Sequence, residues 1–188
     1  MNKKLVILSV LFLVIVGLVA YFANVRAVKI AETIPAPTPV VDAKNATYNI
    51  EGTKITLHDG VFSEPAAPNS ATQIVTRYFG NEALGDFNGD GKQDTAFLLT
   101  QDGGGSGSFF YIAVALGEAS GVQGTNALFL GDRIAPQNVE WMNGKIIANY
   151  AVRKAGEPMT AQPSIGVSMY FTVVNNTLVA ATATSTHL

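Results

Sequence analysis

The chain has 188 residues, of which 48% are hydrophobic and 14% are charged, and its formal net charge at pH 7 is −2. It contains no cysteine, which excludes disulfides, cysteine nucleophiles and a lipid-modified N-terminal cysteine. Nine basic and fourteen acidic residues lie beyond Arg26, a net charge of −5 for that part of the chain. Because nucleic acids bind to basic surfaces, we expect no nucleic-acid partner.

The first predicted element is an apolar segment near the N-terminus. Residues 5–23 carry no charge, and at about 1.5 Å per residue a helix of this length approaches the ~30 Å hydrocarbon core of a membrane. The apolar region of a cleaved signal peptide is shorter, usually about 7–15 residues. We therefore interpret residues 1–26 as a signal anchor with a transmembrane helix, or alternatively as a signal peptide.

The charges that flank this segment predict its orientation. Lys3 and Lys4 precede it, whereas Arg26 and Lys29 follow it. With the free amino group added to the first side, the positive-inside rule favours an N-terminus in the cytoplasm. A single-pass protein of this orientation has its remaining residues outside the cytoplasm, in the periplasm or at the cell surface. A cleaved segment would make the protein secreted.

Residues 27–46 have the composition of a linker. Pro35, Pro37 and Pro39 alternate with other residues, a pattern that favours extended polyproline II structure. We expect this linker to hold the following domain away from the membrane surface.

Residues 47–180 are long enough for one domain with its own core, and their pattern predicts a mainly β structure. Apolar runs at 73–79, 95–100 and 109–116 are rich in β-branched and aromatic residues, as is typical of central strands. Short helices at 71–79 or 135–141 are an alternative. We expect a single antiparallel β domain, a meander, a sandwich or an open barrel, followed by a flexible tail at 181–188.

Turn-forming pairs predict hairpins within this domain. Asn143-Gly144 separates the runs 138–142 and 145–152, and this pair is typical of a type I′ turn, which needs positive φ at both central residues. Further turns are predicted at Asp59-Gly60 and at Asn175-Asn176, the second joining runs 165–174 and 177–180.

The segment 85–94, GDFNGDGKQD, places oxygen-bearing side chains at alternate positions around a glycine turn. Calcium binds six to eight oxygens at about 2.3–2.6 Å, and loop positions 1, 3, 5, 7 and 9 supply them in calcium-binding loops. Three carboxylates this close in sequence also repel one another without a counter-ion. We predict a structural Ca²⁺ site, with a metal-free turn as the alternative. The predicted ligands are Asp86, Asn88, Asp90, the backbone carbonyl of Lys92, and Asp94.

Phe79-Gly80 together with segment 85–94 resembles the first half of an FG-GAP repeat, a VCBS-like calcium-binding unit of integrin-type and bacterial β-propellers. The resemblance implies calcium at the loop, as the alternation does. The closing Gly-Ala-Pro is replaced by residues 100–102, and the block occurs once, so a propeller is not implied. Residues 47–180 also resemble exported bacterial proteins of unassigned function that combine one such loop with a glycine-serine segment.

Other motifs point away from catalysis. Residues 101–108 are rich in glycine but lack the Lys-Ser/Thr ending of a P-loop and precede a strand, so we expect a hairpin loop. His58 lies in a predicted turn, and the second histidine, His187, lies in the tail. Trp141 and most of the aromatic run 109–111 are expected to pack in the sheet rather than to form a sugar-binding platform.

We therefore expect a membrane-anchored or exported, non-catalytic binding or envelope-associated module with one structural calcium ion. Its ligand, a protein or a glycan, is not specified by the residues. One alternative is an extracellular hydrolase that uses two carboxylates in a cleft. Another is a purely structural component of the envelope, with an exposed apolar patch or strand edge.

Overall fold

The computed structural model describes residues 12–24 and 41–181, and the chain divides into two compact units, Met1–Thr38 and Pro39–Leu188. In the first unit, residues 12–24 form a helix with exposed side chains. No helix within the described residues combines the length and the apolar character that a membrane crossing requires. Residues 5–11 of the predicted span lie outside the described residues, as do 25–26 of the predicted anchor, 27–40 of the predicted linker and 182–188 of the predicted tail.

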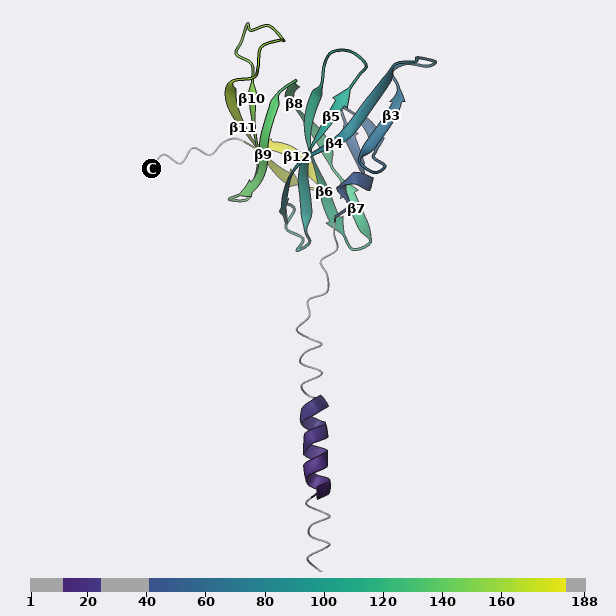
Figure 1. The fold of residues 1–188 in the computed structure, drawn as a ribbon, viewed down its shortest axis with the longest axis vertical. Coiled ribbons are helices and arrows are strands. Elements are labelled where there is room, and N and C mark those ends of the chain that lie inside the picture. The colour runs from purple at the N-terminus through teal and green to yellow at the C-terminus, as the bar shows by residue number, and fades with distance from the viewer. Residues whose placement is uncertain (1–11, 25–40, 182–188) are drawn as a thin grey trace, which may run out of the picture. The chain divides into compact units, whose positions relative to one another are not determined.

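The second unit is built from strands that follow a short 3₁₀ helix (Figure 1). The elements are η1 (Ala43–Asn45), β1 (Thr47–Ile50), β2 (Thr53–Thr56), β3 (Val61–Pro65), β4 (Gln73–Gly85), β5 (Asp94–Asp102), β6 (Phe109–Glu118), β7 (Gly121–Gly124), β8 (Asn126–Asp132), β9 (Ala135–Met142), β10 (Lys145–Val152), β11 (Ile165–Val174) and β12 (Thr177–Ala181).

These strands form two sheets. The larger sheet has the order β2-β1-β8-β6-β5-β4-β3, with β7 paired to β6 outside this path. Its pairs are antiparallel except for β1 and β8, which are parallel. The smaller sheet, β12-β11-β10-β9, is an antiparallel meander. The prediction of a mainly β, antiparallel domain is confirmed, with the β1–β8 pair as its exception.

The larger sheet curls so that its two edge strands come together. β2 and β3 are consecutive in the chain and are joined by the turn at residues 57–60. The Gly60 carbonyl in this turn accepts a hydrogen bond from the Tyr78 N–H of β4 at 2.7 Å. The Gly60 N–H donates to the Lys44 carbonyl at 2.9 Å. The sheet is thereby nearly closed around its own interior.

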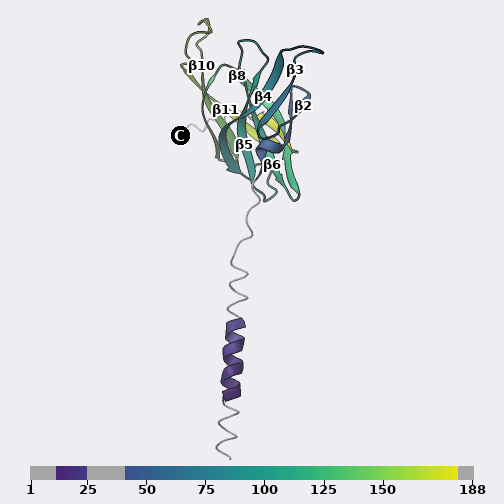
Figure 2. The same cartoon turned by 45° about the vertical axis from the view of Figure 1, so that its right-hand side comes forward.

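Two hydrophobic cores lie on opposite faces of β5 and β6. Because successive side chains of a strand point to opposite faces, Leu98 packs between the two sheets with Ile146 and Phe171. Phe97 instead packs inside the curled sheet with Tyr48. Figures 1 and 2 show β10 and β11 on one side of β5 and β6, and Figure 2 shows β2 and β3 on the other. Burial on both faces explains the uninterrupted apolar runs, and the prediction of central strands is confirmed.

The predicted hairpin turns are also confirmed. Asn143 and Gly144 have φ of 50° and 71°, and Asn175 and Asn176 have φ of 50° and 58°. These pairs join β9 to β10 and β11 to β12, both antiparallel. A local requirement for positive φ was therefore sufficient to fix both hairpins.

Several element assignments were wrong. The alternative helices at 71–79 and 135–141 lie in β4 and β9. β4 continues past its predicted end at Phe79 to Gly85, because Gly80 and Asn81, with φ of 102° and 54°, form an irregularity that shifts the register without ending the strand. β7 and β8 were not predicted, and their glycines and short apolar runs give little alternation.

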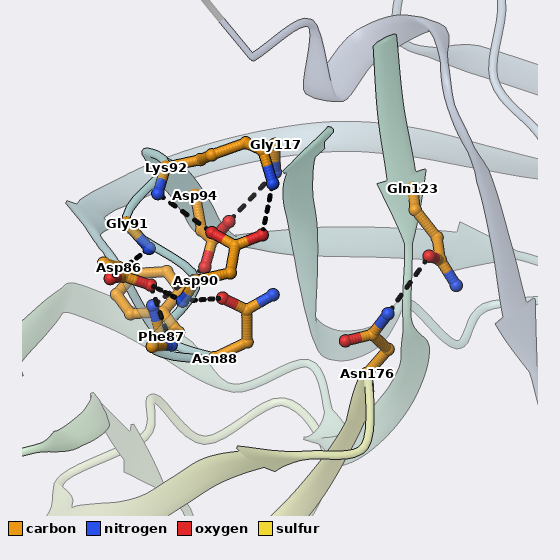
Figure 3. Close-up of polar contacts among 11 residues, drawn as sticks. Asp86, Phe87, Asn88, Asp90, Gly91, Lys92, Asp94, Gly117, Gln123 and Asn176 are labelled. Carbon is orange, nitrogen blue, oxygen red and sulfur yellow. Dashed lines mark hydrogen bonds and ion pairs between the residues drawn. The ribbon is translucent and has the colours of Figure 1, made fainter. Parts of the chain in front are cut away.

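A side-chain amide joins the two sheets at β8 and β12. Asn126 Nδ2 donates to the Leu178 carbonyl at 3.0 Å, and the Leu178 N–H donates to Asn126 Oδ1 at 2.8 Å. On the open edge of β12, the Asn126 side chain therefore makes the two hydrogen bonds that a neighbouring strand would make to Leu178. Asn176 Nδ2 adds a bond to Gln123 Oε1 at 3.2 Å, drawn in Figure 3.

Candidate metal-binding loop

The acidic loop at residues 86–93 connects β4 to β5, and its glycines allow it to turn. Gly89 and Gly91 have φ of 78° and 83°, a region that glycine adopts without steric cost. An added Cβ at either glycine would meet nothing within 4 Å, so the backbone conformation rather than a lack of space requires glycine. The predicted sharp turn after Asp90 is confirmed.

Asp86, at the first position, organises the turn. Its Oδ1 accepts hydrogen bonds from the N–H groups of Gly89 and Asp90 at 2.8 and 3.0 Å, and its Oδ2 accepts one from Gly91 at 2.9 Å. Asn88 Oδ1 accepts a further bond from the Asp90 N–H at 3.1 Å. Figure 3 shows both side chains directed at the backbone of the loop. The loop is thus closed by its own acidic and amide groups.

Asp90 is paired with a cation from the same loop. Its Oδ1 accepts the Lys92 N–H at 2.9 Å, and its Oδ2 accepts the Lys92 ammonium at 2.7 Å. The side-chain bond from Lys92 is the main reason that the pKa of Asp90 lies below its ordinary value. The sequence prediction assigned only the backbone carbonyl of Lys92 to the site. The structure adds the Lys92 ammonium, a positive charge that lies at Asp90.

Asp94 lies at the base of the loop and is fully buried, with 0% exposure. Its Oδ2 accepts the Phe87 N–H at 2.8 Å, and its Oδ1 accepts the Gly117 N–H at 2.9 Å. One carboxylate thereby ties the start of the loop to the end of β6.

Burial raises the pKa of Asp94 above the ordinary value, because desolvation disfavours the charged form. The two N–H donors oppose this increase, whereas the negative charges of Asp90 and Asp86 add to it. The three carboxylates of the loop are therefore close enough to repel one another.

The chemistry of these donors fits a hard cation, since three carboxylates and an amide supply only oxygen. Their arrangement fits less completely. Asp86 already accepts three of the roughly four hydrogen bonds available to a carboxylate. Among the described residues, no group of three or more His, Cys, Asp and Glu side chains is placed to hold a metal ion. Calcium binding at Asp90 requires the Lys92 ammonium to leave its Oδ2.

The sequence prediction did not include Gly117, which completes the base of the loop. A Cβ at this position would collide with the Gln93 carbonyl and would lie 3.3 Å from Val41 Cγ2. Only glycine therefore lets the β6 backbone approach close enough to donate to Asp94. A glycine inside an otherwise apolar strand was the available sequence signal for such an approach.

The other chemical groups considered from the sequence are dispersed. The backbone of His58 pairs with Val61 in a turn, and His187 lies outside the described residues. Asp102 pairs with Arg77 at 3.0 Å, and Asp132 with Arg133 at 2.8 Å. These carboxylates are held by basic side chains rather than by one another.

The aromatic residues divide between core and surface. Trp141 packs against Phe87 with ring centroids 4.8 Å apart and contributes to the core between the sheets, as expected. Phe109 and Phe129 are instead 36% and 49% exposed, with centroids 6.2 Å apart. Phe110 and Tyr111 are 8% and 3% exposed, so the prediction that most of the run 109–111 packs in the sheet is confirmed, and Phe109 is its exposed member.

Fold and loop together define a two-sheet β protein with an acidic β4–β5 loop. Comparisons with protein families, with curated proteins and with solved structures find no match. The FG-GAP resemblance therefore rests on the residues of the loop and stays a prediction.

Proposed function

We propose that the β domain acts outside the cytoplasm as a non-catalytic binding module, held at a membrane through residues 5–23, with a structural calcium ion in the loop at 86–94. Asp86, Asn88 and Asp90 would hold the ion from the turn, and Asp94 from its base, with the carbonyl of Lys92 as a further ligand. The ion's role is to fix the connection between β4 and β5.

The observation that carries this proposal is the burial of Asp94 beside two further carboxylates. A buried carboxylate is costly when it is ionised, and negative neighbours increase that cost. Asp86 and Asp94 also hold the loop through backbone N–H groups, but hydrogen bonds to neutral donors leave the negative charges of both side chains in place. A divalent cation offsets both the desolvation and the repulsion, which supports calcium as a component of the fold.

The non-catalytic part of the proposal is supported by the state of the remaining carboxylates. A hydrolase of the glycosidase type requires two carboxyl groups that face one substrate, about 5–9.5 Å apart. Asp102 and Asp132 instead pair with arginines, and Glu157 accepts the Lys154 N–H at 3.0 Å. Asp42 and Glu82 line one hollow, but Asp42 accepts the Lys44 N–H and Asn45 Nδ2, and Glu82 accepts the Tyr78 hydroxyl. We therefore favour binding over hydrolysis.

The test is thermal unfolding of the full chain in detergent, in excess calcium and then in chelator. At a calcium concentration of about one hundred times Kd, the ion would stabilise the fold by ~2.7 kcal/mol. For a chain of this size, that corresponds to a rise in Tm of roughly 5–10 °C. Magnesium should produce a smaller rise, because it demands a tighter octahedral shell and gives up water reluctantly.

Two variants make the test specific. Asp90→Asn removes a charge from the loop but keeps an acceptor for the Lys92 N–H, and it should abolish the calcium-dependent rise. Asp102→Asn, at the other end of β5, removes the same charge and should leave the rise intact. A midpoint that does not respond to calcium would sink the structural-calcium proposal, and an equal loss in both variants would show that the response is not local to the loop.

A further inference from the structure

A hollow of about 640 Å³ lies beside the acidic loop. Its size falls within the roughly 300–1,000 Å³ that is usual for small-molecule sites. Three segments line it: residues 41–44 at η1, side chains of β4, and Gln93 and Thr95, which flank the buried Asp94. The hollow therefore shares its wall with the base of the acidic loop.

The Tyr78 side chain contacts one cation and one carboxylate in the wall of the hollow. The Lys44 ammonium lies over its ring, 5.1 Å from the centroid, and its hydroxyl donates to Glu82 Oε1. Burial, reinforced by Glu82, raises the pKa of Tyr78, so the hydroxyl stays protonated and remains a donor. One aromatic ring thus positions a cation at its face and a carboxylate at its edge.

Both charges have bonding capacity left. Among the described residues, Lys44 forms no ion pair and Glu82 Oε2 accepts no hydrogen bond. Asp42, the other carboxylate in the wall, is already engaged by the Lys44 N–H at 3.2 Å and by Asn45 Nδ2 at 2.8 Å. Asp42 keeps its negative charge, so the wall carries two carboxylates and one ammonium. Glu82 is the carboxylate with an oxygen that accepts no hydrogen bond, and Lys44 is the cation.

Thr95 supplies a neutral polar group to the same hollow. It is only 4% exposed, yet within the described part of the chain its hydroxyl has no hydrogen-bond partner. Alternation along β5 puts its side chain on the same face as Phe97, the face on which Tyr78 packs. Among the described residues no buried side-chain nitrogen or oxygen lacks a partner, so this hydroxyl is open to the hollow rather than buried, and it is available to a bound molecule.

Apart from Gln93, the remaining wall is apolar. Leu84 is 54% exposed beside the hollow, and Val41 and Ala43 line it from η1. Apolar residues in the same hollow as an anion and a cation suit a molecule with short hydrocarbon side chains and two charged ends. A ligand with one charge would leave either Glu82 or Lys44 unmatched.

We propose that this hollow binds a small zwitterion of the size of an amino acid or a dipeptide, with its ammonium group at Glu82 and its carboxylate at Lys44. The Thr95 hydroxyl bonds to the polar backbone of the ligand, and Leu84 contacts its side chain. The inference rests on the binding-module part of the proposed function and not on the calcium ion.

The test is calorimetric titration of the full chain with the dipeptide alanyl-alanine, and with alanine to distinguish the two ligand sizes. Two blocked dipeptides are the chemical controls: the N-acetylated form lacks the ammonium group, and the C-terminal amide lacks the carboxylate. Each block should weaken binding by about tenfold or more, the value of one charged hydrogen bond.

Variants assign each end of the ligand. Glu82→Gln keeps an acceptor for the Tyr78 hydroxyl, and it should bind the free and the N-acetylated dipeptide equally. Lys44→Gln should bind the free dipeptide and its amide equally. Glu64→Gln and Lys54→Gln make the same charge changes outside the hollow and should leave the affinity unchanged. Thr95→Val, which preserves shape, should weaken binding severalfold without lowering the unfolding midpoint.

The outcomes separate this inference from the calcium proposal. Absence of binding at millimolar alanine and alanyl-alanine overturns the inference, as does binding that neither block nor substitution changes. Calcium-dependent unfolding without dipeptide binding supports the loop and rejects the hollow. Dipeptide binding with an unchanged midpoint in calcium supports the hollow and rejects the loop.

Discussion

Each end of β5 is an aspartate next to a loop that contains glycines, but the two carboxylates are held in opposite ways. At the first end, Asp94 is fully buried and both of its oxygens accept backbone N–H groups. At the other end, the Asp102 side chain is 40% exposed and pairs with an Arg77 side chain that is 49% exposed. The contrast shows that burial and backbone partners, rather than residue type, determine how firmly a carboxylate holds a loop.

Within the described part of the chain, the hydrogen bonds of the glycine-rich loop at 103–108 lie where it enters β6. The Ser108 N–H donates to Asp132 Oδ1 at 3.0 Å, and the Ser108 carbonyl accepts the Arg133 N–H at 2.7 Å. This loop and the acidic loop lie at opposite ends of β5. The acidic loop, by contrast, carries internal bonds from Asp86, Asn88 and Asp90 along its length.

The largest expected effect is that of Asp94→Asn. The amide has one acceptor oxygen for two N–H donors and directs its own NH₂ at one of them, so a buried donor is left without a partner. We expect a loss of roughly 2–4 kcal/mol in the free energy of unfolding, measured by denaturant titration in chelator. Asp102→Asn, the matched change at the exposed end, should cost less than about 1 kcal/mol. Equal losses in the two variants would contradict the conclusion that burial and backbone partners determine how firmly each carboxylate holds its loop.

The sequence predicted those parts of the fold that depend on neighbouring residues. Asn143-Gly144 specifies a turn by its φ angles alone, and the run 95–100 is apolar because both faces of β5 are covered. The parallel pairing of β1 with β8 joins residues more than seventy positions apart, and no local pattern encodes it. The predicted strand ended too early, at Phe79, because glycine is typical of turns. In the structure Gly80 instead forms an irregularity within β4.

In the candidate site, too, the features that depend on neighbouring residues were predicted and those that depend on distant contacts were not. The alternation of Asp86, Asn88 and Asp90 was sufficient to predict a turn closed by oxygen-bearing side chains. The partner of Asp94 could not be predicted, because Gly117 lies on another strand and its contribution is a backbone N–H. The ammonium of Lys92 at Asp90 also depends on a side-chain conformation that spacing does not define.

Asn126 extends the comparison of buried and exposed groups to a neutral side chain that bonds to the backbone. Asn126→Asp keeps the acceptor for the Leu178 N–H but replaces the donor to the Leu178 carbonyl with a negative oxygen. We expect a loss of about 1–3 kcal/mol in the free energy of unfolding. Asn176→Asp, at the exposed bond to Gln123, makes the same chemical change and should cost no more than about 0.5 kcal/mol. If the two variants were equally stable, Asn126 would not be joining the sheets.

The ion pair between Lys92 and Asp90 is expected to have a smaller effect, on the calcium affinity of the acidic loop. If calcium binds there, the ammonium and the ion compete for Asp90 Oδ2. Lys92→Met keeps the backbone carbonyl and removes the competitor, so it should raise calcium affinity by up to about fivefold, the value of an exposed ion pair. Lys92→Arg keeps the charge and should leave the affinity, measured by calorimetry, close to that of the native chain. A lower affinity in Lys92→Met would contradict this competition.

The smallest expected effect is a pH dependence at the glycine-rich end of β5. The Arg133 side chain, which contacts Asp132 Oδ2 at 2.8 Å, is the main reason that the pKa of Asp132 lies below its ordinary value, and the Ser108 N–H contributes. A lowered pKa in the folded state means that Asp132 stabilises the fold fully above the ordinary aspartate pKa of ~3.9. This contribution is lost as the pH falls through the lowered pKa, because protonation removes the charge that holds Arg133.

The measurement is the unfolding midpoint of the native chain and of Asp132→Asn from roughly pH 6 to pH 2. The native chain should be modestly more stable at the upper end, and the difference between the two should shrink as the pH falls. Arg133→Gln removes the cause of the lowered pKa and should flatten the same part of the profile. A difference that grows on acidification would have the wrong sign for a carboxylate stabilised in its charged form. Asp132 would then hold Ser108 by a bond that does not depend on its charge.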